Sequence, residues 1–404
     1  MKPRLLQLLV CPVDRTPLDL IEWESGPSEI SAEEIQKARR LGIEPAELSR
    51  EIVTGVLVNR RQKIVYPIYR GIPRLLVFET GVSREFWRQY GGRIGRELPG
   101  FRAPSEGAMP GEEDVLRSFS TEWTNYGWDG RSYWGLTPEA LHRSMDFLLD
   151  LGRTPVRGQR VLEVGIGIGS TADYVTRSND CEMVGIDLSY AVDAAYKPFA
   201  RNSLLHIVQA SAFRVPFPDK AFDFVYSFGV LHHTFSTREA FRSISCLPRA
   251  GGRLFVWVYS PFDETRTMER RMLMRLENAL RPIYWRLPTK LQTLALLPFL
   301  PLYRIHQALV RKKRGPEYVH YGWREAMHAA RDRFTHRFAH RHDEEEVSGW
   351  FAEAGYGDLR FVTPRSAPDF VPTSFVACTG VEGTRQATAG CRSTDRVAAE
   401  GERV

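Results

Sequence analysis

Hydrophobic residues between positions 158 and 260 fall into short runs that alternate with helical patterns. The apolar runs are RVLEVGIG, EMVGIDLS, LLHIVQAS, FDFVYSFGV and GGRLFVWVYS. Parallel strands are buried on both faces, so they read as nearly continuous apolar runs, and the segments between them form covering helices. This pattern predicts an α/β fold with a doubly wound, mostly parallel sheet.

The first 78 residues have a different pattern, which predicts a small β-rich module. Its two β-like segments are LLQLLVCPVDRTPLDL and IVTGVLVNRRQKIVYPIYRGIPRLL, and the second alternates apolar and polar residues. Between them, SAEEIQKARRLGIEPAEL has helical periodicity. Ser31 is placed as the N-cap of this helix and Glu34 lies at the capping-box position, so we expect the helix to begin there.

Composition and periodicity divide the rest of the chain into further units. Residues 79–112, rich in Gly, Arg and Pro, are expected to form a linker with some helix at SREFWRQY. The α/β core is expected at 113–262 and a helical insert at 263–341. A helix and the last strands complete the core at 342–379. Residues 380–404 have almost no large apolar side chains, so we expect a disordered tail.

Overall composition limits the class of protein. With 404 residues, 43% hydrophobic and 26% charged, the chain is typical of a soluble globular protein of two or three domains. The uncharged apolar stretch between Lys290 and Arg304 is interrupted by Pro298 and Pro301 and is too short to span a bilayer. The N-terminal apolar run is broken by Gln7 and lacks a cleavage site, which argues against a signal peptide. We therefore expect a cytoplasmic protein. Five scattered cysteines indicate no disulfide framework.

A glycine-rich loop follows the first apolar run of the core. Its glycines are Gly165, Gly167 and Gly169. A dinucleotide fingerprint would read GxGxxG, but Ser170 occupies the place of the third glycine. Glu163 would set a negative charge beside a pyrophosphate, whereas it suits a ligand with a cationic end. S-adenosylmethionine (SAM) has an ammonium and a sulfonium group and no phosphate.

A second acid follows the next apolar run. Asp187 closes VGIDLS, one βαβ unit after the glycine loop. At the carboxyl end of a strand this carboxylate can accept hydrogen bonds from both ribose hydroxyls. Asp187 alone does not separate NAD from SAM, but together with Glu163 and the GxGxG spacing it favours SAM.

With these motifs in order, residues 158–260 resemble the class I SAM-dependent methyltransferases, and the similarity resumes at 342–378. The first motif of that family matches EVGIGIG at 163–169, and its fourth-strand and post-strand motifs match FDFVYSFGVLHHT and LPRAGGRLFVWVY. The ubiquinone/menaquinone C-methyltransferase-like subgroup is the most similar in appearance. The resemblance implies a Rossmann-like, seven-stranded sheet, SAM as cofactor and methyl transfer to a small organic acceptor, such as a natural product or a lipid-like molecule.

The resemblance also implies a set of cofactor-binding residues. The family ends its third strand in an acid that receives the adenine amino group, whereas this chain has the neutral Ser211, which should bind more weakly. Neighbouring Ala212 is expected to contribute through its backbone. The full expected set is Glu163, Gly165, Gly167, Gly169, Asp187, Leu188, Ser211, Ala212 and Phe228.

Two adjacent histidines are the candidates for chemistry. His232 and His233 come just after the fourth strand, at the sheet edge where open α/β folds bind ligands. The sulfonium already activates the methyl group, so positioning supplies most of the catalysis, and a base is needed only where the acceptor must lose a proton. We expect one of the two to be a base or a substrate contact. The alternative is that one packs in the core and one caps the next helix.

Substrate contacts are expected from two further segments. The aromatic segment before the helix that starts at Thr137 includes Trp123, Tyr126 and Tyr133, which form either a lid over the cleft or a packing core. In DRFTHRFAHRHDEEEV, His340 and His342 could reach the substrate. We predict no metal site there, because helix capping explains the acids that follow.

The N-terminal module resembles the zinc-ribbon-like domain that activates tRNA and protein methyltransferases. The closing YPI and GIP motifs at 66–68 and 71–73 are intact, and Cys11 remains. Asp14 stands where a second cysteine would be, and zinc needs three or four good ligands. The sequence therefore predicts a degenerate module in which Cys11 is a small buried hydrophobe.

The insert is strongly basic. Residues 263–314 contain 12 Lys/Arg and 4 Asp/Glu, a balance of +8, which exceeds the +6 of the whole chain. Three interpretations remain open, in order of preference: a helical lid over the substrate, an amphipathic surface for peripheral contact with anionic membranes, and an RNA-binding surface around 311–314. Nucleic acid is the least favoured partner. The sequence says nothing about the oligomeric state.

Two alternatives to methyl transfer also remain open. One is a SAM-fold enzyme that catalyses a non-methylating reaction such as a cyclisation, which the altered adenine position at Ser211 allows. The other is a binding module for RNA or a protein partner, which predicts weak or absent SAM binding.

Overall fold

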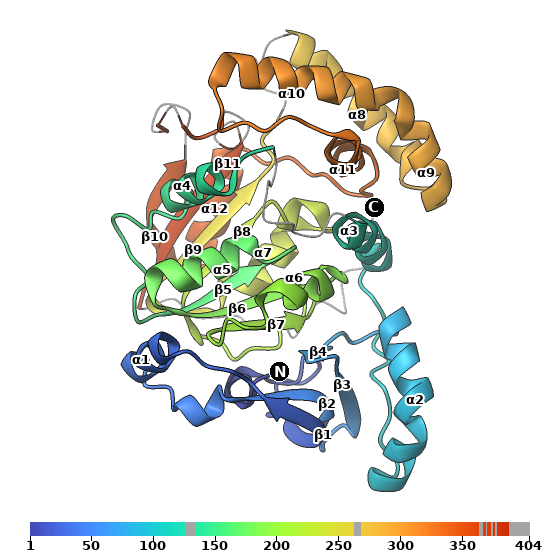
Figure 1. Ribbon diagram of the computed structural model, residues 1–404, viewed down its shortest axis with the longest axis vertical. Helices are drawn as coiled ribbons and strands as arrows, with labels where there is room; N and C mark the ends of the chain where they lie inside the picture. The colour runs from blue at the N-terminus through green and yellow to red at the C-terminus, as the bar shows by residue number, and fades with distance from the viewer. Residues whose placement is uncertain are drawn as a thin grey trace.

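The computed structural model describes residues 1–125, 135–261, 268–362, 367–368, 370–372, 375 and 378–387. Two sheets organise these residues (Figure 1). A four-stranded antiparallel sheet in the order β1-β2-β3-β4 forms the N-terminal module, and a seven-stranded sheet in the order β10-β11-β9-β8-β5-β6-β7 forms the core. The predicted α/β fold with a mostly parallel seven-stranded sheet is confirmed.

The core sheet is parallel from β7 to β9 and antiparallel at its other edge. Its strands are β5 (Arg160–Val164), β6 (Glu182–Asp187), β7 (Leu205–Gln209), β8 (Phe222–Phe228), β9 (Pro248–Val258), β10 (Tyr356–Val362) and β11 (Thr379–Arg385). The parallel strands are almost wholly buried, which explains their continuous apolar sequences.

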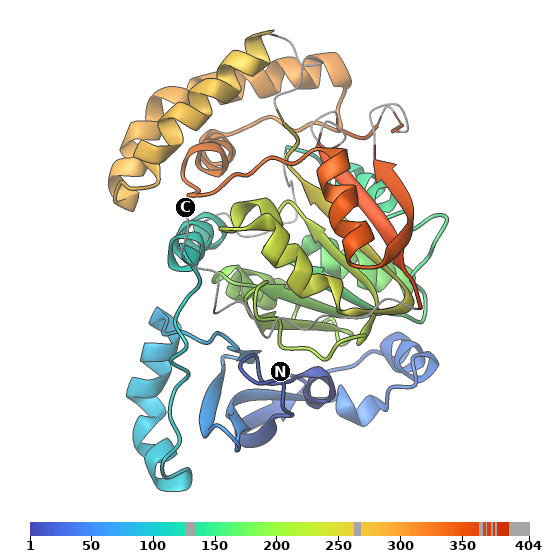
Figure 2. The same ribbon diagram turned by 180° about the vertical axis from the view of Figure 1, so that it is seen from behind.

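Helices cover both faces of this sheet (Figures 1 and 2). On one face lie α4 (Pro138–Leu148), α5 (Ser170–Asn179) and α6 (Ala191–Phe199), and on the other α7 (Thr237–Ser245) and α12 (Glu344–Glu353). As expected, α4 starts with Thr137 as its N-cap, accepting a hydrogen bond from the Ala140 backbone, and Pro138 at its first position.

The N-terminal module contains β1 (Asp19–Pro27), α1 (Ala32–Arg40), β2 (Arg50–Asn59), β3 (Ile64–Tyr69) and β4 (Ile72–Pro73). The predicted capping box of α1 is present, with Ser31 and Glu34 in reciprocal hydrogen bonds. The module contacts the core sheet at β7 through an isolated bridge, where the Leu75 amide donates to the Gln209 carbonyl at 2.8 Å. Arg74 pairs with Asp193 on α6 at 2.6 Å, which fixes the module against the end of β7.

The segment expected to be a linker contains a helix of 17 residues, α2 (Gly81–Glu97). Phe86 and Ile94 of α2 pack against Val56 and Val58 of β2, so this segment belongs to the hydrophobic core of the N-terminal module. Its Gly and Arg content concealed an apolar stripe that covers one face of the small sheet.

The insert consists of α8 (Met268–Tyr284), α9 (Thr289–Leu296), α10 (Leu300–Arg314) and α11 (Trp323–Phe334). In both views α8 and α10 form the outermost layer, at the end of the molecule opposite the N-terminal module (Figures 1 and 2). Met327 and Phe334 of α11 pack with Leu296 and Leu300 of the outer helices. Helix α3 (Glu112–Asn125) lies between the insert and the core.

The prediction of a disordered tail from residue 380 is wrong for its first residues, because β11 continues to Arg385. This strand is rich in Gly and Thr, a composition we associated with disorder. Its glycines have a packing role instead: a Cβ on Gly383 would lie 2.8 Å from Leu359 and Phe351 side chains. No helix among the described residues is long and apolar enough to cross a membrane.

Candidate functional site

The glycine loop joins the end of β5 to the start of α5, as the sequence pattern predicted. Gly165 has φ +87°, and a Cβ there would lie 2.1 Å from a methyl group of Val230. Only glycine fits this position, because a side chain would collide with the segment that follows β8. The Gly165 and Ile166 amides donate to the Ile186 carbonyl, which ties the loop to β6.

Glu163 lies beneath this loop, near the end of β5, and is almost completely buried. Burial raises the pKa of its carboxyl to about 8, and the neighbouring Tyr226 side chain opposes this shift only partly. One of its carboxylate oxygens has no hydrogen-bond partner among the described residues. A buried acid without a partner is costly, so this carboxylate is suited to receive a donor from a ligand.

Asp187 ends β6 and faces the same loop. Its carboxylate accepts hydrogen bonds from the Gly167 amide at 3.1 Å and from the amide and hydroxyl of Ser189 at 2.8 and 2.7 Å. Burial raises the pKa of Asp187 as well, and these hydrogen bonds offset part of the shift. The structure therefore brings Glu163 and Asp187 to one edge of the sheet, around the glycine loop.

At the end of β7, Ser211 has an acidic neighbour that the sequence did not reveal. Glu112, the first residue of α3, is buried, and one of its oxygens accepts from the Met109 amide at 2.8 Å. Its other oxygen has no partner among the described residues. Burial raises the pKa of Glu112, and the nearby Ser211 side chain opposes that shift. In the sequence Glu112 reads as an ordinary acid in the first turn of a helix.

The other expected cofactor residues lie around this edge. Leu188 packs against the cluster of Leu76, Val77 and Phe78, and Ala212 lies at the margin of the core. The Phe228 ring lies 4.5 Å from the Trp257 ring at the end of β9. Trp123, expected to contact substrate, is buried against Ile168 and Ala191, so it packs over the glycine loop. Tyr126 and Tyr133 lie outside the described residues.

His232 and His233 form a short 3-10 turn, Leu231–His233, directly after β8, and both are buried. Burial lowers the pKa of both well below the usual value, so both are neutral. Nδ1 of His233 lies 2.8 Å from the Phe338 carbonyl, which can only accept, so Nδ1 carries the proton. The centre of the His232 ring lies 3.9 Å from that of Tyr259, with the two rings tilted by 32°, and neither His232 nitrogen has a hydrogen-bond partner among the described residues.

The two later histidines differ in their surroundings. The backbone amide of His340 donates to the His232 carbonyl at 2.9 Å, so this segment runs beside the turn after β8. The His342 side chain lies 2.8 Å from the Thr237 hydroxyl and 2.9 Å from Glu346. Asp343 caps α12, as the sequence suggested for the acids at this point.

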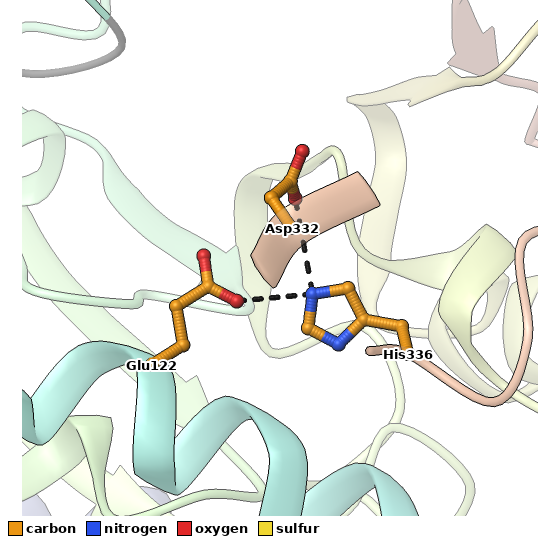
Figure 3. Close-up of side chains that lie close together, drawn as sticks. All are labelled: Glu122, Asp332 and His336. Carbon is orange, nitrogen blue, oxygen red and sulfur yellow. Dashed lines mark ion pairs between the residues drawn. The ribbon is translucent and has the colours of Figure 1, made fainter. Parts of the chain in front are cut away.

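A third group of polar side chains lies between α3 and α11 (Figure 3). Nε2 of His336 is 3.0 Å from Glu122 and 3.8 Å from Asp332, and Nε2 of His328 is 2.7 Å from the other oxygen of Glu122. Among the described residues these atoms of Glu122, Asp332 and His336 are close enough together to hold a metal ion. The sequence contained one signal for this group, because 328, 332 and 336 are spaced four apart, as on one face of a helix, although α11 ends at Phe334.

The N-terminal module differs from a zinc ribbon at the positions noted in the sequence. Cys11 is fully buried, and its Sγ lies 3.3 Å from the Tyr66 hydroxyl. Asp14 accepts hydrogen bonds from Thr16 and from Asn59, the latter at 2.8 Å. Both side chains are thus engaged in contacts within the module.

Known proteins match two parts of the chain. Residues 162–256 match the methyltransferase domain family, and residues 2–71 match the Trm112p-like protein family. The chain is 33% identical over 168 residues to the 27-O-demethylrifamycin SV methyltransferase of Amycolatopsis mediterranei, covering 39% of this chain and 60% of that protein. It is 32% identical over 105 residues to an O-methyltransferase of Aspergillus nomiae, covering 25% of this chain and 47% of that protein. The chain spans about half the length of these relatives.

Among solved structures, the phosphoethanolamine N-methyltransferase 2 of Haemonchus contortus in complex with phosphomonomethylethanolamine and S-adenosylhomocysteine is 13% identical, with a TM-score of 0.42 over 71% of this chain and 62% of that one. The family matches coincide with the two sheets: the methyltransferase match covers β5 to β9, and the Trm112p-like match covers most of the N-terminal module. The chain therefore contains a class I SAM-dependent methyltransferase domain in its α/β core and a Trm112-like domain at its N-terminus.

Proposed function

We propose that this protein is a cytoplasmic enzyme that transfers the methyl group of SAM to a small organic acceptor. The observation that carries the proposal is the pair of carboxylates around the glycine loop, the buried Glu163 and the half-buried Asp187, both with raised pKa values. Glu163 receives the ammonium of the methionine end, and Asp187 receives the ribose hydroxyls. A pyrophosphate would meet two acids at this position, which disfavours a dinucleotide.

Glu112 and Ser211 bind the adenine end in this proposal. The expected weakness of the neutral Ser211 is offset by a carboxylate that α3 brings from a distant part of the sequence. The unpartnered oxygen of Glu112 can accept a hydrogen bond from the adenine amino group. The hydroxyl of Ser211 then orients the carboxylate.

His232 is the proposed proton acceptor. SAM, when bound, supplies a methyl group that its sulfonium already activates. A hydroxyl acceptor must lose its proton as the new O–C bond forms, and a neutral imidazole with unpaired nitrogens can take that proton. Burying such a ring without partners costs about 1–3 kcal/mol, which a bound acceptor would recover.

The two relatives described above favour an oxygen acceptor. One is named as an O-methyltransferase, and the other as the methyltransferase of 27-O-demethylrifamycin SV. Apolar and aromatic groups near His232, including Tyr259 and Trp257, suit an acceptor of natural-product or lipid-like character. His340 runs beside this turn and is a further proposed substrate contact.

Calorimetric titration with SAM and S-adenosylhomocysteine tests the cofactor assignment. We expect micromolar dissociation constants for the wild type and at least a tenfold loss for Asp187→Asn, since one charge-assisted hydrogen bond contributes about 1.5–3 kcal/mol. Asp219→Asn, at an exposed ion pair with Arg15, is the matched control and should bind like the wild type. Absence of binding to the wild type would refute the proposal and favour a partner-binding module.

Formation of S-adenosylhomocysteine separates methyl transfer from a non-methylating reaction. Wild-type protein incubated with SAM and a panel of phenolic, sterol and polyketide alcohols should release S-adenosylhomocysteine with at least one of them. His232→Ala should lower this rate by about 10²–10⁴-fold while SAM binding is retained. Conversion of an acceptor with SAM left unchanged would instead support the cyclase-like alternative.

A further inference from the structure

The group between α3 and α11 has the features of a metal-binding site. Glu122 and His336 are each 1% exposed, and Asp332 is half-buried. Figure 3 shows the carboxylate of Glu122 and the carboxylate of Asp332 approaching the same nitrogen of His336 from two elements. The contributing elements are far apart in sequence, so the arrangement depends on packing of the insert against α3.

Distances within the group match those between ligands of a single ion. Nε2 of His336 lies 3.0 Å from Glu122 Oε2 and 3.8 Å from Asp332 Oδ1, and all three ligand atoms lie within 4.8 Å of one another. Metal–ligand bonds of about 2.0–2.2 Å place neighbouring ligand atoms ~3–4 Å apart. The three side chains could therefore contact one ion with only small adjustments.

Outer hydrogen bonds orient two of these ligands. Nδ1 of His336 lies 3.2 Å from the Ser118 hydroxyl, and the Phe119 ring stacks on the imidazole at 3.9 Å. Oε1 of Glu122 lies 2.7 Å from His328, which leaves Oε2 directed at His336. Metal-binding histidines and carboxylates are usually held by such outer partners.

A cavity of about 190 Å³ lies beside the group. Ser118 and Thr121 of α3 and Thr335, next to His336, line it. This volume exceeds that of several water molecules, so the cavity has room for the water ligands of an ion. On its other side the group adjoins the proposed acceptor site, since the His336 and His233 rings lie 4.9 Å apart.

We propose that Glu122, Asp332 and His336 bind one divalent transition-metal ion, with remaining positions open to water or to an oxygen of the acceptor. One imidazole and two carboxylates suit Zn²⁺, Mn²⁺ or Fe²⁺. Metal binding itself does not depend on the proposed methyl transfer, whereas contact with the acceptor oxygen rests on it. This replaces the expectation from sequence that the chain has no metal site.

Metal titration of chelator-treated protein tests the site. With Zn²⁺ and Mn²⁺ in calorimetry and elemental analysis, we expect one ion per chain in the wild type. Asp332→Asn and His336→Gln should each weaken binding by at least 100-fold, and Ser118→Ala by about tenfold. His142→Gln removes a histidine stacked on Tyr174 away from this group and should bind like the wild type.

Cobalt provides a readout that does not depend on stable variants. Co²⁺ added to the wild type should produce visible d–d bands, and Zn²⁺ should compete them away. Absence of these bands, or stoichiometric binding that Asp332→Asn and Ser118→Ala leave unchanged, would overturn the proposal. Metal binding without SAM binding would refute the proposed function and leave the metal site standing.

An independent observation concerns the outer surface of the insert. Nearly all exposed large apolar side chains among the described residues belong to α8, α9 and α10 and the turns between them. They are Met272, Leu276, Ile283, Leu291, Leu294, Leu297, Leu302, Ile305 and Leu309. We call these nine residues the outer apolar face. Exposed apolar patches of this kind mark interaction surfaces.

The outer apolar face points away from the sheet. On α8, Met272, Leu276 and Ile283 share a helical stripe opposite the buried Met274 and Glu277. On α10, Leu302, Ile305 and Leu309 lie opposite the buried Leu300 and Gln307. The buried sides of these helices face the rest of the insert, and both helices form the outermost layer in Figures 1 and 2.

Charge on this layer is of one sign. Between residues 272 and 314 the one acid is Glu277, which is buried and pairs with Arg333 at 2.8 Å. Exposed bases include Arg275, Lys290, Lys312 and Lys313. Leucines flanked by bases suit a surface that is apolar inside and negatively charged at its boundary.

We infer that the outer apolar face docks on an anionic lipid bilayer, lying in the headgroup region without spanning it. Leucines enter the acyl boundary, and the bases contact acidic headgroups, at about 1 kcal/mol each. Docking does not depend on the proposed methyl transfer.

Sedimentation with vesicles tests this inference. Wild-type protein should bind phosphatidylcholine vesicles that contain 30% phosphatidylserine and should not bind phosphatidylcholine alone. The double variant Lys312→Gln/Lys313→Gln should bind about 30-fold more weakly, since two bases contribute about 2 kcal/mol. Ile305→Ser/Leu309→Ser should weaken binding by at least tenfold, while Phe370→Ser, an exposed apolar residue outside the insert, should have no effect.

Three outcomes would overturn the inference. They are sedimentation without vesicles, which indicates self-association through this face; binding to a single-stranded RNA oligonucleotide but not to vesicles; and vesicle binding that both double variants leave unchanged.

Discussion

Two buried glutamates, Glu163 in the proposed cofactor site and Glu122 between α3 and α11, have pKa values that are shifted in opposite directions. Burial raises the pKa of Glu163 to about 8, whereas hydrogen bonds and charges from His328 and His336 overcome burial and lower the pKa of Glu122 to about 2. Both side chains are nearly inaccessible, so burial alone does not explain the difference. Glu122 has resident donors, whereas Glu163 lacks a cationic partner, which is what a cationic ligand would supply.

The largest expected effect comes from removing the charge of Glu122. Glu122→Gln should lower the free energy of unfolding by about 3 kcal/mol, because it leaves His328 and His336 without their buried carboxylate partner. Denaturant unfolding of metal-free protein measures this change. Glu345→Gln, at an exposed position, should stay within about 0.5 kcal/mol of the wild type. Equal free energies of unfolding for the two variants would mean that the histidine partners of Glu122 do not stabilise the fold.

The same substitution at Glu163 should have the reverse pattern. At pH 7 the buried Glu163 carboxyl is mostly protonated in the free protein, so Glu163→Gln should change stability little. SAM affinity should fall by about 10–100-fold, because a charge-assisted hydrogen bond to the ammonium is lost. Calorimetry and denaturant unfolding on one preparation give both values. A large loss of stability with unchanged SAM affinity would mean that Glu163 is structural.

Binding of SAM should depend on pH with a definite sign. The free carboxyl of Glu163 has a pKa near 8 and must ionise to pair with an ammonium, so below pH 8 binding releases a proton. Affinity should therefore rise with pH and level off near pH 8, with up to about a tenfold difference between pH 6 and pH 7. Calorimetry in buffers of different ionisation enthalpy counts the protons, and Glu163→Gln should lose most of this dependence.

A smaller effect is expected at Glu112, which is also buried and, like Glu163, has a raised pKa. Here the proposed partner is the uncharged adenine amino group, so Glu112→Gln should weaken binding of S-adenosylhomocysteine only about fivefold. The inosine analogue, which has an oxygen in place of that amino group, should bind the wild type poorly and Glu112→Gln comparatively well. Equal discrimination by the two proteins would exclude Glu112 from the adenine site.

Local spacing explains why the core could be predicted. The glycine loop, Glu163 and Asp187 follow strands whose ends meet at one edge of a parallel sheet, so their proximity is implied by the order of strands and helices. The capping box at Ser31 and the helix start at Thr137 involve residues within one turn. Each of these features depends on short segments of the chain.

Errors arose where composition was used in place of packing. The segment expected to be a linker with some helix at SREFWRQY contains the longer α2, whose apolar stripe covers the small sheet, and the tail expected from 380 contains most of β11. Gly and Arg content suggested irregular structure in both. In each case the sheet that the segment covers or extends determines its conformation, and a local window does not include that partner.

By itself the sequence determined the α/β fold, the two domains and the cofactor edge, because periodicity and strand-end motifs are local properties. Tertiary structure alone decided which distant side chains meet. Glu112 reaches Ser211, Glu122 reaches His336, and the leucines of α10 face outward, because α3 and the insert pack on one another across more than half the chain. The choice of such partners depends on burial and shape across the whole fold, which no single segment encodes.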